Sequence, residues 1–381
     1  MEKNKRNNLL EIAQVFFKLG LFAFGGPAAH IAMMEEEIVR KRKWMDHQHF
    51  LDLMGATNLI PGPNSTEMTM HCGYVRGGVK GLFIAGFCFI FPAVILTGLL
   101  AFLYVEFGQV PQIEPFISGI KPAILAVILG AVFKLGKKAL KNWQLAVLAG
   151  LVILVGFLGV NEVTALLSAG LLGGLFFYSI NELKGSDSKR ILPVIGIPFL
   201  SPIIAKTVLS TSKIFWTFLK VGSVLYGSGY VLFAYLKGEL VEPGYLQMNE
   251  LIDAIAVGQF TPGPVLSTAT FIGYQLGGFG GAIAATLGIF LPSFLFVWML
   301  NPLITKLRKN KFLSYFLDSV NVAAVAIMVV VLLEMSYETI INWQSAIIAC
   351  LGIFFVFGPK KLSAIWIVIG GSVLGYFLSF I

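Results

Sequence analysis

Two short segments of this chain combine helix-breaking residues with hydrogen-bonding side chains. Residues 58–66 read NLIPGPNST, and residues 259–268 read QFTPGPVLST. Proline lacks a backbone donor and glycine relaxes the backbone, so each Pro-Gly-Pro is expected to interrupt a helix. The amides and hydroxyls on either side could bind a polar ligand, or they could cap the interrupted helices.

A helix that starts after such a break presents free backbone N–H groups and about half a positive charge, which suits an anion. The two segments therefore predict an anion-binding site. The residues assigned to it are Asn58, Pro61, Gly62, Pro63, Asn64, Ser65 and Thr66 at the first break, and Gln259, Pro262, Gly263, Pro264, Ser267 and Thr268 at the second.

Two lysines and two glycine-rich segments extend the predicted site. Lys18 and Lys220 lie inside apolar runs, where a lysine costs about 2.5–3.5 kcal/mol in a membrane. They could direct a positive potential at the anion, or they could snorkel to the membrane surface. The glycine-rich segments, which could permit close backbone approach, a hinge or tight helix packing, contain Gly25, Gly26, Gly227, Ser228 and Gly229.

Three ionisable residues are candidates for carrying a coupling proton. Glu67 follows the first break. Burial could raise the pKa of its carboxyl so that it carries a proton, or its negative charge could simply stabilise the N-terminus of a helix. His30 and His71 titrate in a useful range, although lone histidines are more often structural. Asp52 and Asp253 occupy equivalent positions near the start of a half-helix, where we expect them to act as caps.

The sequence lacks the motifs of an enzyme. We find no HExxH, GxSxG, Walker or CxxC pattern. The three cysteines are scattered and odd in number, which predicts neither a disulfide framework nor a zinc site. We therefore expect no catalytic residues, no metal and no cofactor.

The composition is that of a polytopic membrane protein. The 381 residues are 57% hydrophobic and 13% charged, whereas soluble domains carry about 25% charged residues. Apolar runs long enough to cross a bilayer as helices recur at 82–105, 115–133, 143–160, 163–180, 282–300, 312–333, 343–358 and 362–381. The N-terminus carries no cleavage site of a signal peptide, and the basic pI near 9.3 reflects short basic loops rather than nucleic-acid binding.

The chain contains an internal repeat. Pro61-Gly62-Pro63 returns as Pro262-Gly263-Pro264, and Asn142-Trp143-Gln144 returns as Asn342-Trp343-Gln344, at offsets of 201 and 200 residues. This agreement predicts a tandem duplication. We divide the chain into a first repeat at 1–180, a linker at 181–212 and a second repeat at 213–381.

Loop charges predict that the second repeat is inverted. Loop 40–43 is Arg-Lys-Arg-Lys, but its counterpart at 237–250 carries one lysine and three glutamates; loop 304–311 is basic, but its counterpart at 104–114 is acidic. Under the positive-inside rule, equivalent loops then lie on opposite sides of the membrane. We predict an all-α membrane protein of two inverted repeats with broken, re-entrant helices at the Pro-Gly-Pro segments, an architecture typical of secondary transporters.

The number of membrane crossings stays open at this point. Segment 50–76 should enter and leave on one side as two half-helices. Segment 9–30 either crosses or is also re-entrant, and in the second case the apolar stretch at 191–205 must cross to preserve the inversion.

The LFAFGGP run at 21–27 and the paired Pro-Gly-Pro motifs resemble the chromate ion transporter family, over nearly the whole chain. The resemblance implies export of the oxyanion chromate, with sulfate as an analogue, driven by the proton gradient across a bacterial cell membrane. The second repeat departs from the family's first motif, because Tyr226-Gly227-Ser228-Gly229 replaces Phe24-Gly25-Gly26-Pro27.

Three other functions were weighed. They are uptake of sulfate or another oxyanion, an anion channel of the same architecture, and a cation transporter that uses Asp52, Glu67 and Asp253. We expect the partners to be a small oxyanion and the lipid bilayer, with a homodimer left open and no nucleic acid.

Overall fold

The computed structural model describes residues 2–23, 26–57, 60–108, 114–182, 209–226, 229–301, 310–359 and 362–380. Within these ranges every regular element is a helix, which confirms the all-α prediction. Among the described residues, five helices are long and apolar enough to cross a membrane, and three shorter apolar helices accompany them. Many large apolar side chains also point outward, among them Phe87, Leu287 and Phe354. Such an apolar surface suits lipid, so the chain is a polytopic membrane protein.

The first repeat contains α1 (Glu2–Phe22), α2 (Gly26–Met34), the π-helix η1 (Glu35–Lys41), α3 (His47–Thr57), α4 (Asn64–Phe107), α5 (Glu114–Ala139), α6 (Trp143–Phe157) and α7 (Glu162–Glu182). Each of the eight predicted apolar runs overlaps a helix in the described part of the chain. The stretch 191–205 lies outside the described residues, so its crossing stays a prediction.

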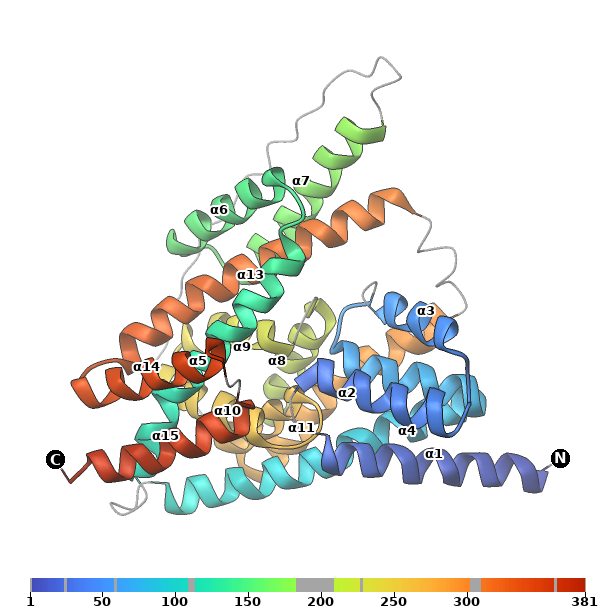
Figure 1. Cartoon of the computed structure of the whole chain (residues 1–381), viewed down its shortest axis with the longest axis horizontal. Helices are drawn as coiled ribbons and strands as arrows, with labels where there is room; N and C mark the ends of the chain where they lie inside the picture. The colour runs from blue at the N-terminus through green and yellow to red at the C-terminus, as the bar shows by residue number, and fades with distance from the viewer. Residues whose placement is uncertain are drawn as a thin grey trace.

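The second repeat contains α8 (Thr211–Val224), the 3-10 helix η2 (Gly229–Val231), α9 (Leu232–Leu236), the π-helix η3 (Lys237–Val241), α10 (Met248–Phe260), the 3-10 helix η4 (Val265–Ser267), α11 (Thr268–Leu300), α13 (Lys311–Thr339), α14 (Trp343–Phe357) and α15 (Ala364–Leu378). Its elements follow the same order of long and short helices as the first repeat. In Figure 1, α1 and α15 lie towards opposite ends of the long axis.

Helix α4 is a hairpin rather than a rod. A straight helix of its 44 residues would be about 66 Å long, twice the thickness of the hydrocarbon core. The chain turns at Gly78, whose φ of 60° and ψ of −152° suit only glycine. Gly73, before the turn, and Gly81, after it, are in backbone contact, so a side chain on Gly73 would meet the Gly81 carbonyl. The arm that begins after the first break therefore folds back on the rest of α4.

Helix α11 repeats this turn. Gly278 has φ 58° and ψ −147°, and Gly273 packs against the carbonyl of Gly281. Between the two arms the hydroxyls of Thr270 and Thr286 are 2.8 Å apart. The duplicated sequence thus produces the same local geometry in both repeats. The orientation of each repeat relative to the bilayer stays a prediction.

The two repeats exchange their last helices. Helices α6 and α7 of the first repeat pack on α13 of the second, while α14 and α15 of the second pack on α5 of the first. This crossing is visible in Figure 1. Small residues allow the close approach: Gly174 contacts the backbone of Phe316, and Gly375 contacts that of Gly119. The largest apolar core accordingly draws residues from both repeats.

Candidate functional site

The first Pro-Gly-Pro lies in a buried gap between two helices. Helix α3 ends at Thr57 and α4 begins at Asn64. Gly62 has a φ of 144°, which a residue with a side chain rarely adopts. The helix is therefore interrupted where the prolines predicted it. Asn58 lies outside the described residues.

The second Pro-Gly-Pro interrupts the chain in the same way. Helix α10 ends at Phe260, and η4, which runs directly into α11, begins at Val265. Gly263 has a φ of 85° and is buried with both of its prolines. Both breaks thus leave a buried helix start that directs backbone N–H groups into the protein.

Each break is bonded to the other repeat. The Gly62 N–H donates to the carbonyl of Leu225 at 2.6 Å, and the Gly263 N–H donates to the carbonyl of Ala23 at 3.0 Å. Ala23 and Leu225 are equivalent residues, each at the end of the helix before its glycine-rich segment. Each break is therefore bonded to the end of the helix that precedes the glycine-rich segment of the other repeat.

The glycine-rich segments are described only in part. Gly26 begins α2 with a φ of 77°, and Gly229 is buried at the start of η2. Gly25, Gly227 and Ser228 lie outside the described residues, so their predicted roles stay predictions.

A buried carboxyl group faces the first break. Glu67 is 0% exposed, and neither carboxylate oxygen has a hydrogen-bond partner within the described ranges. A side chain on Gly62 would meet Glu67 Oε1 and, at 2.5 Å, Ser293 Oγ. Glu67 also lies in the first turn of α4, so the helix-terminus interpretation is compatible with its position. That interpretation does not explain why both buried carboxyl oxygens lack a hydrogen-bond partner among the described residues.

His30 joins three parts of the site. Its Nε2 lies 3.1 Å from the Ala23 carbonyl and its Nδ1 lies 3.3 Å from Ser65 Oγ. A carbonyl can only accept, so Nε2 donates to Ala23, whereas the Ser65 hydroxyl can either donate to Nδ1 or accept from it. Ala23 thus accepts from both His30 and Gly263. His30 therefore links the end of α1 to the start of α4, and its role in proton coupling stays a prediction.

His71 lies further along the same arm of α4 and is also buried. Its Nδ1 is 3.1 Å from Asn301 Oδ1, at the end of α11. Its Nε2 has no partner among the described residues. The contact joins the two repeats, and the proposed role of His71 in proton coupling stays a prediction.

The remaining polar residues at the breaks are buried to different degrees. Thr66, Ser267 and Gln259 each have a buried polar atom without a partner in the described part of the chain. The Thr268 hydroxyl instead donates to the Val265 carbonyl at 2.7 Å. Asn64 is half-buried at the start of α4. The unpartnered groups could therefore bind a polar ligand between the helix starts.

The two lysines lie elsewhere. Lys18 is exposed, and the Lys220 side chain is 54% exposed, with Nζ 2.5 Å from Glu239 Oε1. The structure does not bring either ammonium group to the buried breaks. Their assigned role stays a prediction, and their placement fits the alternative, in which lysines reach out from apolar helices to the surface.

Asp52 and Asp253 do not cap helices, so that prediction was wrong. Both lie in the second turn of their helices, α3 and α10. Asp253 Oδ2 accepts from Tyr104 Oη at 2.6 Å and pairs with Lys121 Nζ at 3.3 Å, both from the first repeat. Asp253 thus joins the repeats through a buried ion pair.

A second polar link was also missed from the sequence. Lys237 of η3 lies 2.8 Å from Glu334 of α13 and 3.6 Å from Glu162 of α7. These pairs could not be found from sequence spacing, because each one joins residues of different helices. Ser293 was missed for the same reason.

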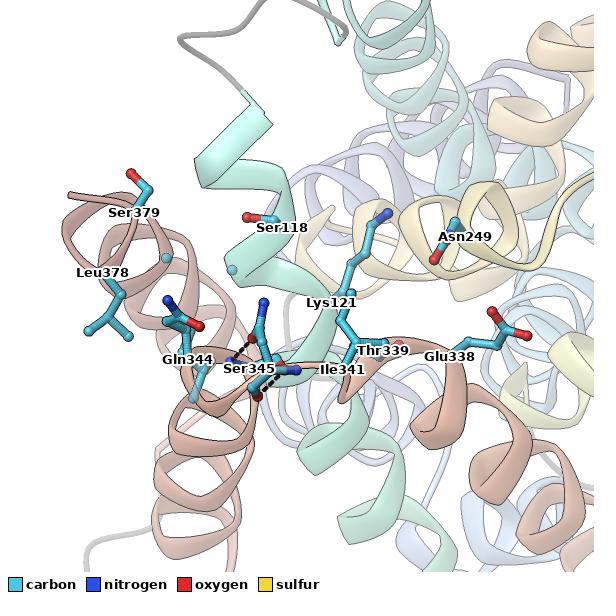
Figure 2. Close-up of a pocket in the computed structure, with 14 residues that line it drawn as sticks. Ser118, Lys121, Asn249, Glu338, Thr339, Ile341, Gln344, Ser345, Leu378 and Ser379 are labelled. Carbon is cyan, nitrogen blue, oxygen red and sulfur yellow. Dashed lines mark hydrogen bonds between the residues drawn. The ribbon is translucent and has the colours of Figure 1, made fainter. Parts of the chain in front are cut away.

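A polar pocket of about 310 Å³ opens between α5, α13, α14 and α15. In Figure 2 the Lys121 side chain extends from α5 along this pocket towards the helix that carries Asn249. The pocket therefore reaches the Lys121–Asp253 pair rather than the two breaks.

Comparisons with known proteins were made over the whole chain. The chromate transporter family model matches twice, at residues 10–174 and 212–376. The chain is 28% identical to a chromate transport protein of Cupriavidus metallidurans, covering 96% of this chain and 92% of that protein. It is 27% identical to a probable chromate transport protein of Synechococcus elongatus, covering 97% and 95%.

A shorter relative matches a single repeat. The uncharacterized transporter YwrA of Bacillus subtilis is 29% identical over 142 residues, which are 36% of this chain and 80% of that protein. No solved structure matches the chain. The family is one of membrane transporters rather than enzymes. The chain belongs to the chromate transporter family, as a fused member that carries the family domain twice.

Proposed function

We propose that this chain is a secondary transporter that exports chromate, with sulfate as an analogue, at the expense of the proton gradient. Relatives that match nearly the whole chain are named chromate transport proteins, which supports the substrate. The observation that carries the proposal is the reciprocal bonding of Gly62 to Leu225 and Gly263 to Ala23. It ties each break to the other repeat, which supports a site between the repeats in which a tetrahedral dianion would bind to the N–H groups of both helix starts.

The proposed mechanism is alternating access between inverted repeats. The opposite charges of equivalent loops support the inversion. The breaks lie where the repeats meet, so a rocking motion of one repeat against the other would open the site to each side in turn. The cross-repeat hydrogen bonds of Gly62 and Gly263 would then be made and broken during transport.

The test is flux in proteoliposomes that contain the purified full-length chain. Labelled chromate and sulfate are supplied with and without an imposed pH gradient. We expect chromate movement that depends on the gradient, runs against its own concentration difference and is competed by sulfate. Flux that never exceeds equilibrium would indicate an anion channel. No flux of either anion in monodisperse protein would overturn the proposal.

A further inference from the structure

The two breaks are equivalent in sequence, yet their surroundings differ. At the first, a side chain on Gly62 would meet Glu67 Oε1 and Ser293 Oγ. At the second, a side chain on Gly263 would meet Ala93 Cβ at 2.8 Å, together with backbone carbonyls. Ala93 and Ser293 occupy equivalent positions, each directly after the proline inside α4 or α11. Each break is therefore closed by a residue of the other repeat, and only at the first break is that residue polar.

The residue five positions after the glycine differs as well. It is Glu67 at the first break and Thr268 at the second. The Thr268 hydroxyl donates to the carbonyl of Val265 within its own helix. Both Glu67 oxygens and the Ser293 hydroxyl lack partners in the described part of the chain, and both residues are 0% exposed. The first break thus holds unused hydrogen-bonding groups that the second break does not reproduce at these positions.

An ionised carboxylate without partners in a dry site is costly, so such a group binds a proton or a hydrogen-bond donor. A serine hydroxyl can hydrogen-bond to the ionised and to the protonated carboxyl group, because it can donate to a carboxylate and accept from a carboxylic acid. No ion pair with Glu67 is found among the described residues. A permanent counter-charge would hold the carboxylate ionised, whereas this arrangement leaves it free to take up and release one proton.

Three other titratable groups surround this carboxyl. Tyr226, after α8, lies near enough to interact with its charge. His30 of α2 is occupied by Ala23 and Ser65, and His71 of α4 is bonded to Asn301 of α11. Nearby α10 carries Asp253, which is paired with Lys121 and Tyr104. Within the described part of the chain, Glu67 has neither a hydrogen-bond partner nor a counter-ion, whereas His30, His71 and Asp253 each have a bonded partner.

We infer that the two breaks differ in function: the first carries the proton-binding site of the transporter, with Glu67 as the carrier and Ser293 of the other repeat as its positioning residue, whereas the second contributes only to anion binding. The inference rests on the proposed function and adds the site of coupling to it. One proton is taken from water on one side and returned to water on the other, and no covalent bond to the anion forms.

The test measures the pH dependence of chromate flux in proteoliposomes for the wild type and Ser293→Ala. The Ser293 hydroxyl has no hydrogen-bond partner among the described residues, and in the proposed arrangement it donates to Glu67 once the carboxylate is ionised, so losing it would remove a donor that favours the carboxylate. The pH of half-maximal flux should therefore rise, by up to about one unit, which is a tenfold change in proton affinity. The matched control is Ala93→Ser, which adds a hydroxyl at the equivalent position of the second break and should leave the half-maximal pH unchanged.

Glu67→Gln completes the test. It should lose the response of chromate flux to an imposed pH gradient. Glu67→Asp, which keeps a carboxyl, should preserve the response to the gradient but displace the pH profile. Size-exclusion elution of every variant in detergent checks that each is folded. The inference is overturned if Glu67→Gln still responds to the gradient, or if Ser293→Ala keeps the wild-type profile. Failure of the wild type to move either anion would instead overturn the proposed function.

Discussion

The backbone N–H of Gly62 donates a 2.6 Å hydrogen bond to the carbonyl of Leu225, a residue of the other repeat. The equivalent bond runs from Gly263 to Ala23 in the opposite direction. Both donors are bonded across the two repeats, so a rearrangement of the repeats would release these backbone N–H groups. In the proposed mechanism, anion binding at the breaks and movement of the repeats would therefore involve the same backbone atoms.

Gly62→Ala should abolish most transport. Its φ of 144° disfavours any side chain, and the new methyl group would strike Glu67 Oε1 and Ser293 Oγ. We expect flux to fall at least tenfold and the protein to lose about 1–3 kcal/mol of stability. Gly150→Ala is the matched control, because a methyl group there meets open space. Flux and thermal unfolding check both variants, and wild-type behaviour of Gly62→Ala would show that the break tolerates a side chain.

Lys121→Met should weaken the junction between the repeats. It leaves Asp253 buried beside Tyr104 without its counter-ion, a loss of about 1–3 kcal/mol. Lys141→Met breaks the more exposed Lys141–Asp318 pair and should cost less than about 1 kcal/mol. Thermal unfolding in detergent compares them. Equal destabilisation by Lys121→Met and Lys141→Met would mean that burial of the Lys121–Asp253 pair adds nothing to the stability of the protein.

Gly375→Val should disrupt the packing of α15 on α5. The new side chain would meet the backbone of Gly119, 2.5 Å from its Cα, and such overpacking typically costs about 1–3 kcal/mol. Gly370→Val lies on the same helix, where an added Cβ has nothing within 4 Å, so its unfolding temperature should stay near that of the wild type. A reversed order of stability would contradict the packing of α15 described here.

Lys18→Gln and Lys220→Gln distinguish the two interpretations of these lysines. Both side chains are exposed, and Lys220 is already paired with Glu239. From this placement we expect chromate flux within about twofold of the wild type, since an exposed ion pair contributes little. A loss of flux in well-folded protein would restore the interpretation drawn from the sequence, in which the lysines attract the anion.

Cysteine labelling tests the inversion. Lys41→Cys and Glu242→Cys place thiols in the two equivalent loops of opposite charge, where the native side chains are 59% and 44% exposed. Both are made in a background with Cys88 and Cys350 replaced by serine. An impermeant maleimide applied to intact cells should label Cys at position 242 and spare position 41. Labelling of both positions from one side would show that the repeats are parallel.

Much of this architecture could be predicted from local sequence. The apolar runs predicted the helices, and the Pro-Gly-Pro segments predicted the breaks, because hydrophobicity and helix-breaking act through neighbouring residues. The turn at Gly78 was not predicted, although its glycines were recognised as part of the repeat.

The missed parts of the site depend on contacts between distant residues. Ser293 reaches the first break from the other repeat, and Asp253 finds its partners on α4 and α5. The exposure of Lys18 likewise depends on which face of α1 packs against other helices. Spacing along one chain carries no information about such partners.

The exchange of terminal helices also has a consequence for synthesis. Helix α5 packs on α14 and α15, which follow it much later in the chain. The face of α5 that they cover therefore lacks its packing partners until these helices of the second repeat have been synthesised. A truncation within α15 would therefore damage the beginning of the protein as much as its end.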